Sequence, residues 1–289
     1  MFLSYSRAFY ELKNKLQPLY DDREAEALAH EILYFITGLD KTQRLLQKEM
    51  LFTIAQQEKY ELAVTDLLSG KPLQYITGSA WFMGREFHVN EHVLIPRPET
   101  EELVQWIIDD RKNKAGNISI LDIGTGSGCI PISLKLALSH ADVTTCDISN
   151  DALNAAKKNA DRLQASIQLL KLDFLDAAQR NKLANYDVIV SNPPYIPVSE
   201  KENLHTNVKD YEPGIALFVP DDDPLVFYKA LALFGKEHLK PKGYIYCELD
   251  AGHAMECKAI FEECGYKEVL IKKDMNGKWR LLSAEKPQP

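Results

Sequence analysis

Apolar residues recur at helical spacing through the first 72 residues of the chain. The clearest run begins at Asp21, which makes a plausible capping pair with Glu24, and closes at Gly38. Similar runs on either side of it predict a total of about four or five short helices, each with one apolar face. We therefore expect a small helical bundle over residues 1–72, in which His30 is structural and no catalytic cluster is present.

The pattern changes between residues 73 and 95. Residues 79–83 and 86–89 are each typical of a strand, and Gly84 between them predicts a hairpin turn. Residues 93–95 form a further apolar run that we expect to be extended. This β-hairpin is predicted to connect the bundle to a second domain, which would cover residues 96–289.

Strand and helix patterns alternate through the rest of the chain. Strands are expected at residues 118–123, 143–146, 167–172, 187–190, 244–249, 269–273 and 279–283. Helical patterns separate most of them, so we predict an α/β fold with a doubly wound, mostly parallel, seven-stranded Rossmann-like sheet. Asn276-Gly277 predicts a hairpin between the last two strands, which would put one antiparallel strand into that sheet.

Composition narrows the class of protein without naming it. With 289 residues, 45% of them hydrophobic and 26% charged, the chain has the length and make-up of a globular protein of about two domains. No apolar run reaches the roughly 20 residues that span a bilayer, and the N-terminus lacks a secretory pattern. Five cysteines without CxxC spacing indicate reduced cytoplasmic thiols and no metal site.

The net charge is −8, which argues mildly against a protein that grips long stretches of nucleic-acid backbone.

The segment Ser191-Asn192-Pro193-Pro194-Tyr195 follows an apolar run that ends abruptly. Each proline fixes its own φ and removes a backbone donor, so the segment is expected to be a rigid loop at the carboxyl end of a strand. The loop would present the Asn192 amide, the Pro193 carbonyl and the Tyr195 ring, which together could hold a planar substrate that carries nitrogen. The alternative is an ordinary turn between a strand and a loop.

A glycine-rich segment follows the first predicted strand of the second domain. It runs Leu121-Asp122-Ile123-Gly124-Thr125-Gly126-Ser127-Gly128 and opens a helix, so the backbone could approach a ligand closely at a positive helix terminus. The dinucleotide fingerprint would place glycine or alanine at position 129, where this chain has Cys129. A tight turn with no ligand is the alternative. In open α/β sheets, however, ligands bind beyond the carboxyl ends of the strands.

Two further predicted strands also end in candidate ligand-binding residues. Asp147 lies 23 residues after Gly124 and could accept hydrogen bonds from both hydroxyls of a ribose. It could instead cap the next helix, although Ser149 and Asn150 are better placed to do so. Phe174 ends the third strand and could cover an adenine ring, or could simply be part of the core.

These motifs resemble a known family of enzymes. The glycine-rich and Asn-Pro-Pro-Tyr segments are similar to those of S-adenosylmethionine-dependent methyltransferases that act on planar nitrogen. Three further segments narrow the resemblance to the protein-(glutamine-N5) methyltransferases that modify peptide chain release factors: Gln74-Tyr75-Ile76-Thr77-Gly78, Val93-Leu94-Ile95-Pro96-Arg97-Pro98-Glu99-Thr100-Glu101 and Tyr211-Glu212-Pro213. The similarity extends from about residue 73 to the C-terminus, and the small helical domain is consistent with it.

The resemblance implies the activity and the role of each site residue. Residues 123–127 would contact the methionine part of S-adenosylmethionine, while Asp147 would hold its ribose and Phe174 its adenine. Asn192 and Pro193 would accept hydrogen bonds from the glutamine amide, with Pro194 and Tyr195 completing the substrate site. Asn192 is also assigned to the cofactor side of the site.

The resemblance also implies the partners of the chain. The substrate would be the glutamine of the Gly-Gly-Gln loop of release factors, recognised with the help of residues 1–72. We expect a cytoplasmic monomer that contacts neither membrane nor nucleic acid. An adenine-N6 or guanine-N2 nucleic-acid methyltransferase remains the alternative, because it would carry the same tetrapeptide. The sequence departs from the family pattern at Asp221–Leu225, which lacks a glycine, and the resemblance assigns no role to Glu248–His253.

Overall fold

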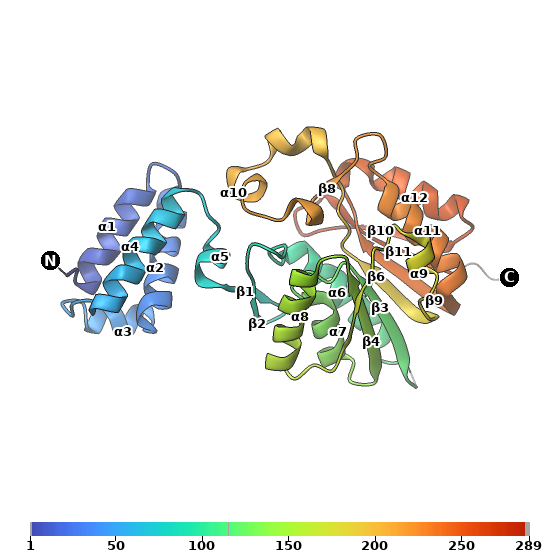
Figure 1. Cartoon of the computed structure of the whole chain (residues 1–289), viewed down its shortest axis with the longest axis horizontal. Helices are drawn as coiled ribbons and strands as arrows, with labels where there is room; N and C mark the ends of the chain where they lie inside the picture. The colour runs from blue at the N-terminus through green and yellow to red at the C-terminus, as the bar shows by residue number, and fades with distance from the viewer. Residues whose placement is uncertain (1, 115, 287–289) are drawn as a thin grey trace. The chain divides into compact units, whose positions relative to one another are not determined.

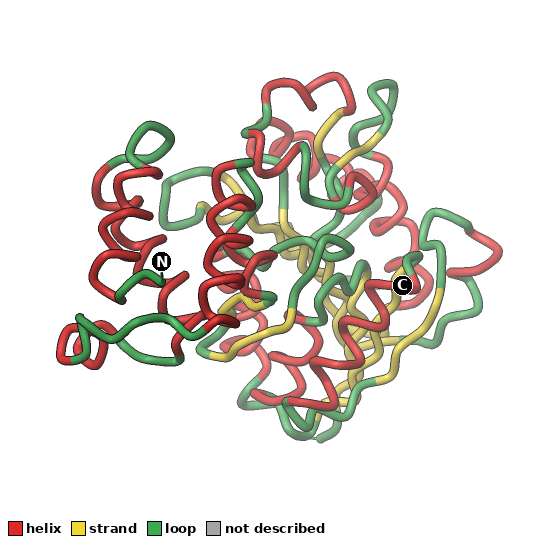
Figure 2. Tube along the Cα trace, turned by 60° about the vertical axis from the view of Figure 1, so that its left-hand side comes forward, coloured by secondary structure: helices red, strands yellow, loops and turns green. Residues whose placement is uncertain are grey.

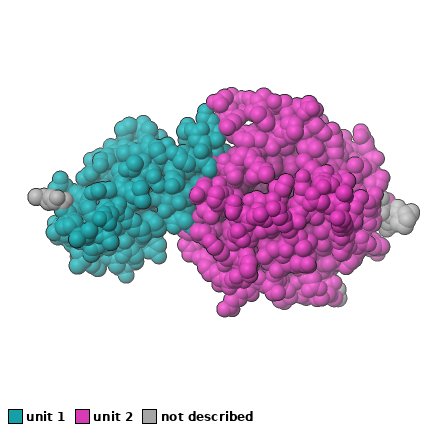
Figure 3. Space-filling model, viewed as in Figure 1, with its two compact units in different colours: residues 1–78, 205–211 teal, residues 79–204, 212–289 magenta. Residues whose placement is uncertain are grey.

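A computed structural model describes residues 2–114 and 116–286 of the chain. The chain divides into two compact units (Figure 3). The first extends to Gly78 and takes in His205–Tyr211, and the second contains Ser79–Leu204 and the residues from Glu212 onward. Each unit is described by itself below.

The helices and strands of the described residues are shown in Figure 1. The helices are α1 (Tyr5–Leu16), α2 (Asp22–Thr37), α3 (Lys41–Leu46), α4 (Ile54–Leu68), α5 (Leu73–Thr77), α6 (Pro98–Arg111), α7 (Cys129–Ala137), α8 (Asn150–Arg162), α9 (Ala177–Arg180), α10 (Thr206–Lys209), α11 (Val226–His238) and α12 (Ala254–Glu263). The strands are β1 (Ser79–Phe82), β2 (Arg85–His88), β3 (Ile118–Ile123), β4 (Ala141–Asp147), β5 (Gln168–Lys171), β6 (Tyr186–Ser191), β7 (Ile196–Pro197), β8 (Phe218–Val219), β9 (Leu239–Glu248), β10 (Lys267–Lys273) and β11 (Trp279–Glu285).

The first unit is the helical bundle that the sequence predicts. The Asp21 side chain accepts hydrogen bonds from two backbone N–H groups at the start of α2, and Gly38 ends this helix with a φ of 70°. The apolar faces of α1, α2 and α4 meet in one core, where the hydroxyl of Tyr60 donates to the carbonyl of Ala8. Burial of these faces stabilises helices that would be marginal on their own.

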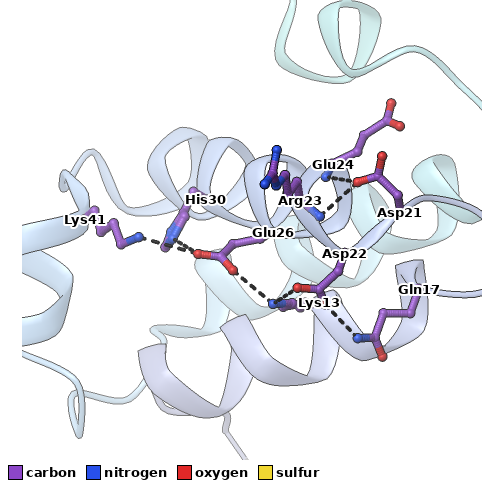
Figure 4. Close-up of polar contacts among 9 residues, drawn as sticks. All are labelled: Lys13, Gln17, Asp21, Asp22, Arg23, Glu24, Glu26, His30 and Lys41. Carbon is purple, nitrogen blue, oxygen red and sulfur yellow. Dashed lines mark hydrogen bonds and ion pairs between the residues drawn. The ribbon is translucent and has the colours of Figure 1, made fainter.

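Polar side chains link α1 and α2 on the surface of this bundle (Figure 4). The Lys13 ammonium lies 3.1 Å from a carboxylate oxygen of Asp22 and 2.9 Å from one of Glu26. His30 stacks on the ring of Phe9 at 4.5 Å, and its Nδ1 lies 3.1 Å from the Arg44 guanidinium. Because arginine only donates, Nδ1 is the acceptor, and burial lowers the pKa of His30. These contacts are consistent with the structural role expected of this histidine.

A later segment of the chain returns to the first unit. The sequence predicts only a long stretch without regular structure after Ile196, but residues 205–211, which include α10, pack with the bundle unit. The Tyr211 hydroxyl donates to the carbonyl of Ser69 over 3.0 Å and lies 2.8 Å from its hydroxyl. The pattern of apolar residues in such a short segment gives no sign of this contact.

Within the described residues of the second unit, seven strands form one sheet in the order β10-β11-β9-β6-β3-β4-β5. β11 runs antiparallel to both of its neighbours, and the other pairings are parallel. The chain builds β3, β4 and β5 in one direction and then returns to place β6 on the other side of β3. The predicted α/β sheet is therefore confirmed, and its topological switch point lies between β3 and β6.

Helices cover both faces of this sheet, as Figure 2 also shows. One face packs against α11 and α12, and the other against α6, α7 and α8. The side chains of successive residues in a strand point to opposite faces of the sheet, so Ile120 and Leu121 lie in different cores. The β1–β2 hairpin joins the α6–α8 side, where Phe82 and Phe87 meet edge to face at 6.1 Å. The predicted hairpin is thus confirmed at Ser79–His88.

Two expectations about extended segments need correction. Residues 93–95 form no strand, although Val93 and Ile95 are buried, because their apolar side chains pack without a neighbouring strand to pair with. β9 begins at Leu239 rather than near residue 244, since it pairs with β6 over a longer stretch than its apolar run indicates. Among the described residues, no helix is both long enough and apolar enough to cross a membrane.

Candidate active site

The carboxyl ends of four neighbouring strands open onto one cavity of about 330 Å³ in the second unit. Its wall contains the glycine-rich segment after β3, Asp147 at the end of β4, Phe174 after β5 and Asn192 after β6. Pro193 and Pro194 also line it, whereas Tyr195 does not. Because parallel strands end at the same edge of a sheet, residues far apart in the sequence are brought together here.

The glycine-rich segment forms a tight turn that is held by β4. The backbone N–H groups of Gly124 and Thr125 both donate to the carbonyl of Cys146, at 2.9 and 3.1 Å. Gly128 has a φ of 82°, and a Cβ atom there would lie 3.1 Å from the Cα of Ala156 on α8. Glycine is therefore needed at this position both for the backbone conformation and for the close packing of α8.

Asp147 connects this turn to the start of α8. One carboxylate oxygen accepts the backbone N–H of Gly126 at 3.0 Å, and the other accepts that of Ser149 at 2.8 Å. Ser149 itself caps α8 by accepting the N–H of Ala152. Burial raises the pKa of Asp147, and the backbone donors oppose that rise. Of the two interpretations of Asp147, the helix cap is therefore wrong, because Ser149 fills that position.

Phe174 belongs both to the cavity wall and to the core. It is 5% exposed, and its ring meets that of Phe234 edge to face at 5.3 Å. The two interpretations of Phe174 are therefore compatible, because one part of the ring packs inward while another part lines the cavity.

The Asn-Pro-Pro-Tyr loop is joined to two residues for which the sequence gave no role. The side-chain nitrogen of Asn192 donates to the Thr100 hydroxyl over 3.1 Å, and that hydroxyl donates to Glu248 over 2.6 Å. The Tyr195 hydroxyl lies 3.4 Å from the other oxygen of the same carboxylate. Burial raises the pKa of Glu248 to about 7.

The two family-specific segments that flank the cavity also meet. Arg97, which lines the cavity, forms an ion pair with the buried carboxylate of Glu212. Burial raises the pKa of Glu212, and the guanidinium of Arg97 opposes that rise. This contact ties the residues before α6 to the segment that leads into β8, where Ile215 and Phe218 also line the cavity.

Two family models match the chain. The PrmC N-terminal domain is matched over residues 9–78, which lie in the first unit, and a methyltransferase small domain is matched over residues 101–209, most of which lie in the second. A release factor glutamine methyltransferase from Bacteroides thetaiotaomicron is 40% identical over 95% of this chain and 98% of its own length. The chain belongs to the release factor glutamine methyltransferase family.

Further relatives agree with this assignment. A release factor glutamine methyltransferase from Flavobacterium psychrophilum is 38% identical over 92% of this chain and 94% of its own length. The crystal structure of a methyltransferase from Pyrococcus furiosus has the same fold, with a TM-score of 0.52 and 19% identity over 71% of this chain and 91% of that one. The family resemblance and the methyltransferase fold predicted from the motifs are therefore confirmed.

Members of a methyltransferase family need a site for a methyl donor, and the cavity has the chemistry to hold S-adenosylmethionine. The Thr125 and Ser127 hydroxyls of the glycine-rich turn line the cavity. These polar groups suit the charged amino-acid end of such a donor. The ring of Phe174 and the carboxylate of Asp147 suit its nucleoside end.

Sequence reasoning assigned no individual role to Thr100, Glu248 or Asp122. Thr100 and Asp122 each had a signal, because they lie inside segments that carry the family resemblance. Asp122 and Glu248 each occupy the carboxyl half of a predicted strand, where an acid is unexpected in a buried element. Their spacing in the sequence alone does not reveal which side chains they meet.

Proposed function

We propose that this family member transfers a methyl group from S-adenosylmethionine to the side-chain amide nitrogen of the glutamine in the Gly-Gly-Gln loop of peptide chain release factors. The products would be N5-methylglutamine and S-adenosyl-L-homocysteine, with the displaced amide proton released to solvent. The observation that carries the proposal is the position of Asn192 and Pro193 on the wall of the same cavity as the glycine-rich turn. The names of the relatives supply the class of substrate.

Residues 123–127, Asp147 and Phe174 would hold the methyl donor, and Asn192 also belongs to this side of the site. The bound donor supplies an electrophilic methyl group on a sulfonium sulfur. The chain itself has to bind the donor and to orient the glutamine amide, so a strong base is not required.

The Asn-Pro-Pro-Tyr loop would bind the glutamine amide. An amide nitrogen is a weak nucleophile because its lone pair is delocalised into the carbonyl group. The side-chain oxygen of Asn192 and the carbonyl of Pro193 would each accept one N–H of this group, which orients the nitrogen and stabilises the positive charge it gains. Pro194 makes the loop rigid. Tyr195 would pack against the plane of the amide, for which its ring has to turn toward the cavity that it does not line in this structure.

We further propose that residues 1–72 contribute to recognition of the release factor, a role that rests on membership of the family. The chain would act in the cytoplasm as a monomer and would not bind nucleic acid directly. The net charge of −8 supports the last point, because phosphate binding draws on clustered lysine and arginine.

A methyl-transfer assay with labelled S-adenosylmethionine tests the proposal. Substrates would be a release factor, the same factor with its Gly-Gly-Gln glutamine changed to alanine, and single- and double-stranded nucleic acids. We expect label on the intact factor alone. Label on nucleic acid and not on the factor would overturn the proposal and favour a base methyltransferase.

The variant Asn192→Ala tests the assigned role of the loop. It should lower kcat by about 100-fold or more, because a hydrogen-bond partner of the transition state is lost. Asn117→Ala is a matched control, since Asn117 lies just before β3, at the end of the strand away from the cavity, and its side chain donates a hydrogen bond to Asp142. Near-normal turnover by Asn192→Ala would show that the loop does not orient the amide.

A further inference from the structure

Thr100 and Glu248 form a buried connection at the substrate side of the cavity, where Thr100 lines the wall and Glu248 lies behind it. Thr100 lies in the first turn of α6 and Glu248 is the last residue of β9, and each is 3% exposed. They are 148 residues apart in the sequence and meet over 2.6 Å. Asn192 joins them from the loop after β6, so three separate segments of the second unit converge at this point.

The chemistry of these groups sets the direction of both hydrogen bonds when Glu248 is ionised, which its pKa of about 7 favours above neutral pH. An ionised carboxylate only accepts, so the single hydroxyl hydrogen of Thr100 is donated to Glu248. The Thr100 oxygen can then only accept from Asn192, which must offer its NH2 group. The side-chain oxygen of Asn192 is therefore the end of the amide that remains for a ligand in the cavity.

We propose that Thr100 and Glu248 are positioning residues that hold Asn192 with its side-chain oxygen available to the substrate. This inference rests on the proposed function and adds to it. A loop that offers only acceptors binds an NH2 group and repels a carboxylate, so the connection makes the site select glutamine over glutamate. The Tyr195 hydroxyl lies 3.4 Å from the second oxygen of Glu248, so the same carboxylate also contacts the aromatic residue of the loop.

A purely structural role for Glu248 is hard to reconcile with its surroundings. The carboxylate is buried at the end of a core strand, and burial raises its pKa to about 7. The charged groups around it are Arg280 and Glu99, with Thr100 and Tyr195 as its hydrogen-bonding neighbours. An apolar residue would fill the position without the cost of removing a charge from water, which is a reason to expect a functional role.

The first test removes the Thr100 hydroxyl. Thr100→Val keeps the shape of the side chain and should lower kcat for release-factor methylation by roughly 10- to 100-fold, because Asn192 can then turn. The affinity for S-adenosylmethionine should stay within about threefold of wild type, the spread expected when no contact to the donor changes. Thr100→Ser retains the hydroxyl and should recover most of the rate. Thr144→Val, on β4 and outside the cavity wall, is the control for replacing a threonine in the same unit.

A double-mutant cycle asks whether Thr100 acts through Asn192. If it does, Thr100→Val should change kcat by less than about twofold in an Asn192→Ala background. The inference would be overturned if the losses in kcat of the two single variants multiplied in the double variant. A Thr100→Val enzyme with wild-type kcat would also overturn it. Either result would overturn only this inference and would not affect the proposed function. The proposed function would be contradicted by a wild-type chain that does not label the release factor.

A second test follows selectivity and does not depend on the rate. Glu248→Gln can donate to Thr100, so the Asn192 amide is free to present either end. The measured quantity is the inhibition constant of a Gly-Gly-Glu peptide divided by that of a Gly-Gly-Gln peptide. We expect this ratio to be about tenfold lower in Glu248→Gln than in wild type, because one polar contact contributes on this scale. An unchanged ratio in a variant that unfolds at the wild-type temperature would show that Glu248 does not set the orientation of Asn192.

Discussion

The side-chain amide of Asn159 donates a hydrogen bond to the carbonyl of Ser127 over 2.8 Å. Asn159 lies on α8 and is fully buried. The same amide donates to the carbonyl of His88 at 2.9 Å and accepts its N–H at 2.7 Å. One side chain thus joins the glycine-rich turn, helix α8 and the β1–β2 hairpin, although these come from separate parts of the sequence.

Replacing this residue should weaken both the fold and the cofactor site. Asn159→Ala leaves buried backbone groups without partners, so we expect the free energy of unfolding of the second unit to fall by about 1–3 kcal/mol. The dissociation constant for S-adenosylmethionine should rise, since Ser127 lines the cavity. Urea unfolding and calorimetric titration measure the two effects. Asn154→Ala, exposed on the same helix, should change neither, and an equally stable Asn159→Ala would contradict this account.

Two glycines separate the effect of backbone conformation from that of packing. Gly128 and Gly277 have φ values of 82° and 80°, but only at Gly128 would a Cβ atom meet close neighbours. Gly277→Ala should cost about 1–2 kcal/mol of unfolding free energy for the left-handed conformation alone. Gly128→Ala should cost a further 1–3 kcal/mol or so, because α8 must also move away. Equal losses in thermal unfolding would mean that α8 does not pack as closely as described.

Asp122 should make stability depend on pH. It is fully buried beneath the glycine-rich turn, and burial raises its pKa to about 7. Between the ordinary pKa of an aspartate, about 4, and this value, the folded chain keeps a proton that the unfolded chain has released. The stability that this group contributes is therefore complete below pH 4 or so and is lost as pH rises through about 7.

The comparison that isolates this effect is between wild type and Asp122→Asn. As pH rises from 5 to 8, the unfolding free energy of wild type should fall relative to that of the variant, as measured by urea denaturation. Asp142→Asn, which changes an exposed carboxylate on β4, should follow the wild-type curve. A constant difference between wild type and Asp122→Asn would show that Asp122 ionises no differently in the folded chain.

Phe174 should affect stability and cofactor affinity separately. Phe174→Leu keeps an apolar side chain in the core but removes the ring that faces the cavity. We expect affinity for S-adenosylmethionine to fall by about 2- to 10-fold, the range of an aromatic contact beyond its buried area. Phe261→Leu is the matched control, because Phe261 is fully buried in the same core and does not line the cavity. Both variants should lose stability, but only Phe174→Leu should lose affinity.

The sequence determined the architecture and most of the cavity wall. Buried strands and amphipathic helices each have a characteristic spacing of apolar residues in the sequence. The alternation of the two patterns predicts a parallel sheet with helices on both faces. The carboxyl ends of those strands then gather Gly124, Asp147, Phe174 and Asn192 at one edge, as the cavity shows. Local chemistry was enough here because each residue is placed by the strand that precedes it.

Only the tertiary structure decided which side chains meet at that wall and behind it. Thr100 and Asn192 are 92 residues apart, and their contact depends on α6 lying next to the end of β6. The return of residues 205–211 to the first unit is equally invisible in the sequence. Periodicity reports whether a residue is buried, whereas the order and register of the strands decide which residue it meets. The sequence therefore determined the sheet and the Asn-Pro-Pro-Tyr loop, and the packing of distant elements around Glu248 decided how that loop is held.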